Sequence, residues 1–445
     1  MMALRPAMTE ADPRPIAAIV LAAGKGTRMR SARHKVLHEI AGRPMIEHLL
    51  ASLAELAPAR TVVVVGEGRE QLEAALAGRA DFAVQHPQLG TGHAVQQAEA
   101  ALAGFDGDVL VLYGDVPFVR GATMRAMIER LRADDLPEAV VLAFEPDDPL
   151  QYGRVIAAGD RISWMVEHKD ADEGQRACRL CNSGLLAARS DALFALLARV
   201  GNDNAQREYY LPEIVNIAVA DGRICAVITT DDPDEVAGIN SRAELAAAEA
   251  RWQRARRARA MDEGATLVAP ETVFFSWDTR LGRDVTVEPN VVFGPAVDVA
   301  DGVVIHAFSH LEGARLASGA SVGPFARLRP GAVLGEGAKA SHLTYLGDAT
   351  VGAGANIGAG TITCNYDGYF KHRTEIGPGA FIGSNSALIA PVRIGADAIV
   401  AAGSAVSRDV ADGELRMVRA EQLVKPGWAD RFHDAMKRKK AEAKK

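Results

Sequence analysis

The sequence contains no run of 18 apolar residues, so we expect no membrane-spanning helix. Only 5% of its 445 residues are aromatic, and its formal net charge of −7 argues against a nucleic-acid-binding protein. Four cysteines in a chain of this length favour a reducing compartment over a disulfide-stabilised secreted fold. The segment Met1–Pro15 has no apolar stretch like that of a secretion signal. These shortages predict a cytoplasmic protein with no membrane and no nucleic acid among its partners.

Two of the cysteines, Cys178 and Cys181, have the spacing of a redox or zinc-binding pair. No second pair and no nearby histidine completes such a site. We therefore interpret both as incidental cysteines.

Glycine, in contrast, is abundant, with 42 residues, and in the second half of the chain an aliphatic residue returns at nearly every sixth position. A period of six fits neither a helix nor a half-buried strand, and a repeat this regular is typical of a solenoid. Three such hexads form one triangular coil of a β-helix, with one aliphatic side chain pointing inward on each side. We predict a β-helix over residues 263–425, followed by a basic tail, 426–445, that we interpret as a solvated terminus rather than a phosphate-binding segment. The repeated positions are Leu281, Val287, Phe293, Val299, Ile305, Leu311, Val322, Leu328, Leu334, Ala340, Leu346, Ile376, Ile382, Leu388, Ile394, Val400 and Val406.

The first half alternates apolar strands with helical stretches, for example Met45–Leu56 and Gly121–Arg132. This alternation predicts a Rossmann-like α/β domain over residues 1–240, with a mostly parallel sheet and a ligand at the carboxyl ends of its strands. A stretch without Gly or Pro, Ser241–Arg259, predicts a linker helix within 241–262. The clearest strands are Ile16–Leu21, Thr61–Val65, Val109–Tyr113, Ala139–Phe144 and Ile224–Thr229.

A glycine-containing loop directly follows the first strand and carries the run Leu21-Ala22-Ala23-Gly24-Lys25-Gly26. Backbone amides at such a strand-to-helix turn can form a nest for an anion. Lys25, Arg28 and Lys35 add three cations, which suits a triphosphate. The loop is neither a Walker A motif nor a dinucleotide fingerprint, because it lacks the residues that close either one.

Asp115 follows the buried apolar strand Val109–Tyr113. A carboxylate there needs a cation or strong hydrogen bonds, which makes Asp115 a candidate ligand of Mg²⁺. The alternative is a carboxylate that caps the following helix.

His342 lies within the hexad region, next to Ser341. Acyl transfer from a thioester to an amine needs a base with a pKa near neutrality, which an imidazole supplies. The alternative is an ordinary surface histidine.

Further motifs run through both halves of the chain. In the first half they are Gln88-Leu-Gly90-Thr91-Gly92-His93, Tyr113-Gly-Asp115-Val-Pro117, Tyr152-Gly153-Arg154, Glu167-His-Lys-Asp170, Asn182-Ser-Gly184 and Gly238-Ile-Asn240. In the second half they are Gly323–Gly331, His342–Asp348, Asn356–Thr361 and Cys364–Gly368. Together with the first loop, these motifs resemble the bacterial bifunctional family N-acetylglucosamine-1-phosphate uridylyltransferase / glucosamine-1-phosphate N-acetyltransferase, over nearly the whole chain.

The resemblance implies a left-handed parallel β-helix that trimerises, and two reactions. Glucosamine-1-phosphate would be acetylated from acetyl-CoA, and N-acetylglucosamine-1-phosphate would then receive UMP from UTP with release of pyrophosphate, Mg²⁺ assisting. Arg28 and Lys35 would steady the phosphates, and Asp115 with Asn240 would hold the metal. Gln85, Gly90 and Thr91 would read the uracil, while Gly153, Glu167 and Asn182 would hold the sugar. The resemblance also assigns UTP or UDP-N-acetylglucosamine contacts to Leu21, Ala22, Ala23, Gly24, Lys35, Tyr113 and Asn240.

For the β-helix the resemblance implies a second set of residues around His342. Glucosamine-1-phosphate would contact Arg329, Tyr345, Asn356 and Lys371. Acetyl-CoA would contact Asn365, Tyr366, Ser384, Ala402 and Arg419. The break in the hexads at Asp367–Thr374 has the look of a loop directed toward a neighbouring subunit, and its alternative is a solvated excursion.

The chain departs from the family pattern in two places. His34 stands where a proline usually precedes the lysine, so we expect Lys35 to be held less firmly. One coil that usually separates the Arg-Pro-Gly and His-Leu-Thr-Tyr segments, and that carries a phosphate-binding lysine, is missing. Its loss shortens the prism by about 4.8 Å, shifts Arg329 relative to His342 and predicts weaker acetyl transfer, with Lys339 as a possible replacement.

Two other functions compete with this interpretation. One is a nucleotidylyltransferase for another base or sugar, such as an ADP-glucose or dTDP-glucose pyrophosphorylase. The other is a non-catalytic scaffold that pairs the same two folds, as in translation-factor exchange subunits. The presence of Arg28, Lys35, Asp115 and His342 favours an enzyme.

Overall fold

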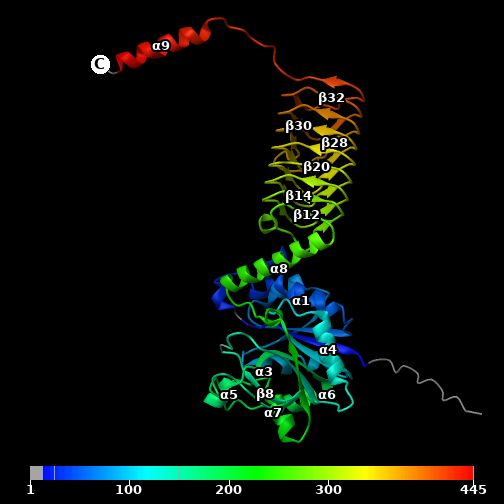
Figure 1. Ribbon diagram of the computed structural model, residues 1–445, viewed down its shortest axis with the longest axis vertical. Coiled ribbons are helices and arrows are strands. Elements are labelled where there is room, and N and C mark those ends of the chain that lie inside the picture. Colours follow the sequence, from blue (N-terminus) through cyan, green and yellow to red (C-terminus); the bar gives the residue numbers. More distant parts are fainter. Residues whose placement is uncertain (1–13, 25, 150, 444–445) are drawn as a thin grey trace, which may run out of the picture. The chain divides into compact units, whose positions relative to one another are not determined.

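The computed structural model describes residues 14–24, 26–149 and 151–443 (Figure 1). The chain divides into two compact units, Met1–Trp252 and Gln253–Lys445. The division falls inside helix α8 (Arg242–Asp262), so the expected linker helix is present and contributes residues to each unit. Lys25 of the predicted anion loop lies outside the described residues, as do Lys444 and Lys445 of the tail.

The first unit is built on one nine-stranded sheet. In spatial order its strands are β5 (Asp81–Val84), β4 (Arg60–Val65), β1 (Ile16–Leu21), β6 (Asp108–Tyr113), β10 (Cys181–Arg189), β7 (Ala139–Phe144), β11 (Cys225–Thr230), β9 (Arg161–Val166) and β8 (Arg154–Ala158). The five strands expected from the sequence are all present, within a residue of their predicted limits.

The sheet is mixed rather than mostly parallel. Strands β5, β4, β1 and β6 run parallel, and so do β7 and β11. Strand β10 enters between β6 and β7 in the antiparallel direction, and β8 and β9 form an antiparallel hairpin at the edge. The carboxyl ends of β1, β4, β5 and β6 therefore meet at one edge, which is where the sequence places the ligand.

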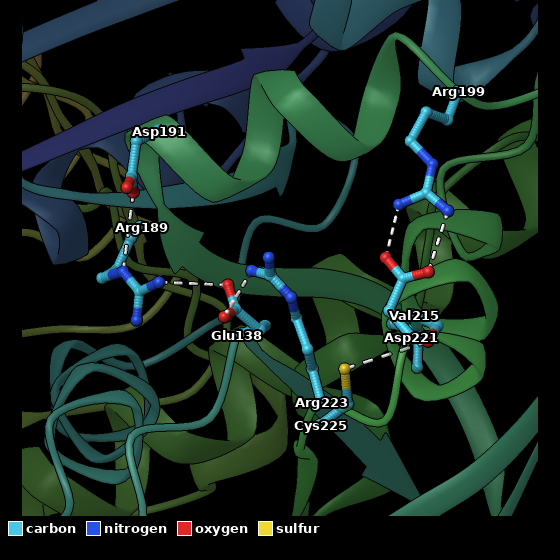
Figure 2. Close-up of polar contacts among 8 residues, drawn as sticks. All are labelled: Glu138, Arg189, Asp191, Arg199, Val215, Asp221, Arg223 and Cys225. Atoms are coloured by element: carbon cyan, nitrogen blue, oxygen red, sulfur yellow. Dashed lines mark hydrogen bonds and ion pairs between the residues drawn. The ribbon is translucent and has the colours of Figure 1, made fainter.

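Ion pairs fix the reversed strand β10 beside its neighbour β7 (Figure 2). Glu138, immediately before β7, accepts hydrogen bonds from Arg189 at the end of β10 (3.1 Å) and from Arg223 ahead of β11 (2.8 Å). Nearby, Arg199 forms a bidentate pair with Asp221. The Arg189 contact accompanies the antiparallel register of β10 and β7, whereas Arg223 reaches Glu138 from the start of the parallel strand β11.

Helices cover both faces of this sheet. Alternate residues of β1 point to opposite sides, so that Ile19 joins one apolar cluster and Val20 the other. Helices α3 (Thr91–Gln96), α6 (Ser190–Leu197) and α7 (Glu213–Ala220) pack on the first face, and α1 (Met45–Ala54), α2 (Arg69–Ala75) and α4 (Gly121–Leu131) on the second. The short helix α5 is Glu173–Ala177, and a two-stranded ribbon consists of β2 (Glu39–Ile40) and β3 (Arg43–Pro44).

The second unit is a parallel β-helix with three sheets, each strand two or three residues long. Sheet C contains β12 (Thr266–Leu267), β14 (Thr286–Val287), β17 (Val304–Ile305), β20 (Ser321–Val322), β23 (Lys339–Ala340), β26 (Asn356–Ile357), β29 (Phe381–Ile382), β32 (Ile399–Val400) and β34 (Leu415–Arg416). Sheet D contains β15 (Val292–Phe293), β18 (His310–Leu311), β21 (Arg327–Leu328), β24 (Tyr345–Leu346), β27 (Ile362–Cys364), β30 (Ala387–Ile389) and β33 (Ala405–Val406). Sheet E contains β13 (Arg280–Leu281), β16 (Asp298–Val299), β19 (Arg315–Leu316), β22 (Val333–Leu334), β25 (Ala349–Val351), β28 (Thr374–Ile376) and β31 (Val392–Ile394).

The period of six is the spacing of the inward side chains. All of the repeated positions named above are buried except Leu281, which is half-buried. Most successive coils pair in register 17 or 18 residues apart, as between Val304, Ser321 and Lys339, and the spacing rises to 25 residues where the chain makes the excursion after Asn365. The residue before each inward one points outward, so each sheet carries a ladder of outward side chains along the prism.

The last helix, α9 (Trp428–Glu442), has no buried residue. The basic part of the tail is thus solvent-exposed where it is described. Among the described residues, no helix is long and apolar enough to cross a membrane.

Candidate functional site

A cavity of about 330 Å³ opens at the carboxyl ends of the parallel strands in the first unit. Strand β1 ends at Leu21, β5 leads into Gln85 and β6 ends at Tyr113, so three of the four strands in the parallel set β5-β4-β1-β6 deliver residues to one place. The cavity brings together ten residues expected from the sequence: Leu21, Ala22, Ala23, Gly24, Lys35, Gln85, Gly90, Thr91, Tyr113 and Asp115.

At one side of this cavity the predicted metal ligands converge on a cation of the chain itself. The Lys35 ammonium donates to Asp115 Oδ2 at 2.5 Å and to Asn240 Oδ1 at 3.0 Å. Two hard oxygens thus share one positive charge at a largely buried position. Such a donor pair fits Mg²⁺, which typically takes one or two protein oxygens and completes its shell with water and substrate phosphates. Within the described residues there is no cluster of three His, Cys, Asp or Glu side chains that would hold an ion without a substrate.

His34 keeps the backbone that a proline would have at this position. Its φ of −57° and ψ of 140° lie in the region that proline favours. Its backbone N–H, which proline lacks, donates to Gln71 Oε1 at 2.9 Å. The expected loosening of Lys35 is therefore offset by a hydrogen bond. Burial, and then the Lys35 charge, lower the pKa of the His34 imidazole, so it stays neutral beside the lysine.

The residues expected to read the base form a compact polar wall. Gln85 is buried, and its amide donates to the Gly90 carbonyl at 2.9 Å. Thr91 Oγ1 accepts from the Leu211 N–H at 3.0 Å. Gly90 has a φ of 109°, and a Cβ there would lie 2.7 Å from the Tyr209 carbonyl oxygen. Only glycine fits at this close approach.

The residues expected to hold the sugar lie next to Tyr113. A Cβ on Gly153 would lie 3.4 Å from the carboxylate oxygens of Glu167, and the Gly153 carbonyl accepts from the Asn182 N–H at 2.9 Å. The three predicted sugar ligands are thus neighbours. Burial, and then Asp170 and Glu208, raise the pKa of Glu167, while burial and Glu167 raise the pKa of Tyr113.

Arg28 is separated from the other predicted phosphate ligands. It lies in the 3₁₀ turn Thr27–Met29, is exposed, and does not line the cavity. Four lining residues were not among the predicted site residues: the apolar Val36 and Ala94, and the polar Gln88 and Glu208. Gln88 begins the motif Gln88–His93, and its amide donates to the Ala23 carbonyl. Glu208 lies in a loop between α6 and α7 with no sequence pattern that could have identified it.

In the second unit the structure aligns His342 with some of the residues predicted to contact acetyl-CoA along one corner of the prism, between sheets C and D. Successive coils place His342, Ala359, Ser384 and Ala402 at this corner, as the backbone bonds Gly360 N–H to His342 O and Gly403 N–H to Ser384 O show. Arg419 approaches the same corner, because a Cβ on Gly403 would lie 3.8 Å from its Cδ. The His342 imidazole is exposed.

The predicted glucosamine-1-phosphate residues lie on different faces. Tyr345 points outward from sheet D, and Arg329 follows strand β21 of the same sheet. Asn356 points outward from sheet C, on the other side of the corner. Lys371 is exposed within the excursion Asp367–Thr374, which ends at the buried Thr374. In one chain these predicted residues therefore lie on two faces rather than around one closed pocket.

Asn365 and Tyr366 lead into that excursion. Asn365 is buried, donates to Asp348 at 2.6 Å and accepts from the Tyr345 hydroxyl at 3.4 Å. Tyr366 is 62% exposed. The Asp367 carboxylate accepts from the Phe370 N–H and pairs with His372, contacts that lower the pKa of Asp367 to about 2. The excursion is thus ordered by its own hydrogen bonds.

The coils stack without a gap where the sequence departs from the family. Arg327 pairs in register with Tyr345, so strand β21, which Arg329 follows, lies directly beside strand β24, which begins at Tyr345. Lys339 pairs in register with Asn356 on sheet C. Lys339 therefore lies next to Asn356, one of the predicted sugar-phosphate residues. Both are on sheet C, whereas Arg329 follows a strand of sheet D.

All four cysteines are unpaired in the structure. Burial raises the pKa of Cys181 and raises that of Cys225 to about 12. Only Cys364 is exposed.

Two family models match the chain. Residues 18–263 match the MobA-like NTP transferase domain, and residues 373–408 match the bacterial transferase hexapeptide model with six repeats. These matches agree with the α/β unit and the β-helix.

Close relatives span the whole chain. Proteins named bifunctional protein GlmU from Sphingopyxis alaskensis and Novosphingobium aromaticivorans are 72% and 76% identical, and each alignment covers 97% of this chain and 99% of the relative. The protein of that name from Zymomonas mobilis is 55% identical, over 96% of this chain and 99% of its own length.

The alignments are longer than the part of this chain that they cover. The alignment with the Sphingopyxis protein runs over 448 positions, whereas 97% of 445 residues is about 432, which leaves about 16 positions without a counterpart here. That number is close to the 17 or 18 residues between paired rungs. The Sphingopyxis protein thus has about one coil's length of residues that this chain lacks.

Proposed function

The chain belongs to the family of the bifunctional protein GlmU, and from this premise we propose how its two units divide the work of a uridylyltransferase and acetyltransferase. The α/β unit transfers UMP from UTP to N-acetylglucosamine-1-phosphate and releases pyrophosphate. The β-helix acetylates glucosamine-1-phosphate with acetyl-CoA. The four unpaired cysteines support a cytoplasmic location for both reactions.

One observation carries the assignment of the first reaction: Lys35, Asp115 and Asn240 meet at the side of a cavity lined by the glycine-containing loop. The backbone around Ala22–Gly24 supplies amides for phosphates, and Gln85 with Thr91 offers amide and hydroxyl groups to a base. Beyond the residues that line this cavity, Gly153, Glu167 and Asn182 are neighbours of one another and offer hydrogen bonds to a sugar. This layout supports a nucleotide and a sugar phosphate placed end to end.

Transfer of a phosphoryl-type group needs positioning and charge neutralisation rather than a covalent nucleophile. The sugar-phosphate oxygen attacks the α-phosphorus in line, a P–O bond forms, and pyrophosphate leaves. Lys35 lies within reach of this centre and neutralises charge on the phosphates. Arg28, exposed on the adjacent turn, adds a second cation at the mouth of the loop.

Mg²⁺, when bound by Asp115 and Asn240, supplies additional positive charge at the phosphates. The Lys35 ammonium now occupies the point between these two oxygens. Asp115 and Asn240 would hold the ion, and Lys35, whose positive charge competes for the same two oxygens, would pair with the phosphates of the nucleotide.

For acetyl transfer, the amine nitrogen of glucosamine-1-phosphate attacks the acetyl carbon, and His342 accepts the proton that the amine loses. A C–N bond forms, the C–S bond breaks, and the coenzyme A thiol leaves. Ser384, Ala402 and Arg419 follow His342 along the corner and offer a track for the long coenzyme. Tyr345, Arg329 and Asn356 lie on two faces, so we propose that neighbouring copies, in a homotrimer of left-handed β-helices, complete each site.

The test incubates the full-length protein with glucosamine-1-phosphate, acetyl-CoA, UTP and Mg²⁺ and omits each component in turn. Thiol release is expected to need the amino sugar, and pyrophosphate release is expected to need UTP together with the acetylated sugar. Equally fast pyrophosphate release with ATP or dTTP would favour a different nucleotidylyltransferase. Absence of both products would favour a scaffold.

A further inference from the structure

A serine, a histidine and a glutamate on three successive coils of the β-helix form a hydrogen-bonded relay. His306 Nδ1 lies 2.9 Å from Glu288 Oε1, and His306 Nε2 lies 3.2 Å from Ser321 Oγ. Glu288 is held in turn, because its Oε2 accepts from the Ala307 N–H at 3.0 Å. These two contacts lower the pKa of Glu288, so it is a carboxylate at neutral pH.

The relay has the arrangement by which a hydroxyl becomes a nucleophile. A neutral imidazole that donates from Nδ1 to a carboxylate has its Nε2 lone pair available to a serine proton. The carboxylate fixes the ring and stabilises the imidazolium that forms. None of these three residues belongs to the acetyl-transfer set around His342.

A cation stands beside the serine. Ser321 on β20 pairs in register with Lys339 on β23, one rung away, and both side chains point outward from sheet C. Paired rungs are about 4.8 Å apart. Within the described residues Lys339 has no ion-pair partner, so its ammonium is available to an oxyanion that forms at Ser321.

An exposed aromatic platform lies next to the relay. Phe308 and Phe325 follow His306 and Gly323 by two residues on adjacent coils, and each is 53% exposed. Their rings stack with centroids 4.9 Å apart. Two stacked aromatic rings in solvent offer a surface for a flat apolar group.

We propose that Ser321 is a nucleophile that takes up an acetyl group from activated acetyl esters or thioesters, with His306 as its base, Glu288 as its positioning residue and Lys339 as the cation at the developing oxyanion. This activity is separate from acetylation of the amino sugar, because it needs no glucosamine-1-phosphate.

The step balances without a cofactor. The Ser321 oxygen bonds to the acetyl carbon, the bond from that carbon to the aryl oxygen or thiol sulfur breaks, and the serine proton passes through His306 to the leaving group. Water then attacks the acetyl-serine with His306 as base and releases acetate. The net reaction is hydrolysis of an ester or thioester.

The experiment treats the full-length protein with p-nitrophenyl acetate in one arm and acetyl-CoA in the other, without amino sugar. It follows release of p-nitrophenolate or thiol and locates the acetyl group by peptide mass spectrometry. We expect acetylation of Ser321, faster from the aryl ester because its flat ring fits the aromatic platform. Ser318→Ala, which removes an exposed hydroxyl on the preceding turn, is the matched control and should react like the parent.

Variants of the relay decide the outcome. Ser321→Ala should lose the acetylated peptide, and His306→Ala should slow its formation by about 100-fold, with partial recovery on addition of free imidazole. Glu288→Asp should label Ser321 faster than Glu288→Ala, because the shorter side chain still carries a carboxylate that can position His306. If Glu288 had only a structural role, two variants of equal thermal stability would label Ser321 at the same rate. The proposal is overturned if acetylation occurs only on lysines, if Ser321→Ala reacts like the parent, or if His306→Ala labels Ser321 at the parental rate.

Discussion

The two units of this protein present their functional groups in opposite ways. In the α/β unit, Lys35, Asp115, Gln85 and Thr91 converge on one cavity, and their polar atoms already have partners within the chain. In the β-helix, His342 and Arg329 are exposed, and the remaining residues point from two different faces. A sheet with loops at one edge can close a site within a single chain, whereas a straight prism can only display ladders on flat faces. The difference predicts that the first activity belongs to the protomer and the second to the assembly.

The largest effect should come from removing the carboxylate of the cavity. Asp115→Ala is expected to lower uridylyl transfer by about 10²–10³-fold, because the charge that would hold Mg²⁺ is lost. Acetyl transfer should remain at the parental rate. The measurement is pyrophosphate release alongside thiol release, with Asp106→Ala, an exposed aspartate ahead of the same strand, as control. Unchanged pyrophosphate release would refute the metal assignment.

Mixing of inactive variants tests the comparison most directly. Asn356→Ala alters sheet C and Tyr345→Ala alters sheet D, so each alone should impair acetyl transfer. Hybrid oligomers refolded from both should regain activity, because some sites combine two intact faces. Refolded mixtures of Lys35→Ala and Asp115→Ala should regain no uridylyl transfer. Recovery of uridylyl transfer, or none of acetyl transfer, would contradict the division between protomer and assembly.

Lys35 should also compete with the metal. The Lys35→Met variant is expected to bind Mn²⁺ about tenfold more tightly than the parent in the absence of nucleotide, since a like charge a few ångströms away is removed. Isothermal titration calorimetry measures this without any turnover. Weaker binding by the variant would show that Lys35 does not occupy the metal position.

Gly90 tests the rigidity of the cavity wall. Gly90→Ala should destabilise the α/β unit by about 1–3 kcal/mol, because the backbone is left-handed and the new Cβ would meet the Tyr209 carbonyl. Gly78→Ala, at a φ of 73° with nothing within 4 Å of the new Cβ, is the comparison variant and should lose less stability. Urea unfolding provides both free energies. Equal losses in the two variants would remove the argument from close packing.

The smallest effect concerns the thiols. A disulfide reagent near pH 8 should modify the exposed Cys364 and leave Cys225 intact, because burial raises the Cys225 pKa to about 12 and little thiolate forms. Since Cys364 precedes Asn365, modification should lower acetyl transfer a few-fold and spare uridylyl transfer. Peptide mapping with both assays checks this, and Cys364→Ser should resist the loss.

The repetitive β-helix could be predicted from the sequence more fully than the irregular α/β unit. The period of six identified inward residues such as Val287 and Ile305, because every coil imposes the same local requirement. Strand β1 and the cavity residues after it were predicted from a local run and the motifs beside it. Strand β10 was not, because Cys181–Arg189 contains Gly184 and two alanines, and its antiparallel place depends on distant partners such as Glu138.

Contacts between distant segments were also beyond the sequence. The Lys35–Asn240 hydrogen bond joins residues 205 positions apart, although each had been expected at the site separately. Glu208 enters the cavity from a loop without a motif. The relay of Glu288, His306 and Ser321 depends on a register of 17 and 18 residues between coils, which only the stacked structure fixes.

The register between Arg327 and Tyr345 has an evolutionary consequence. A β-helix made of similar coils can gain or lose one coil while the coils on either side keep their structure. Each such event changes which charged ladders become neighbours in a single step of about 4.8 Å. Deletion of a whole coil can thus change, in one event, which side chains lie together and which ligands they recognise. Single substitutions do not produce such a change.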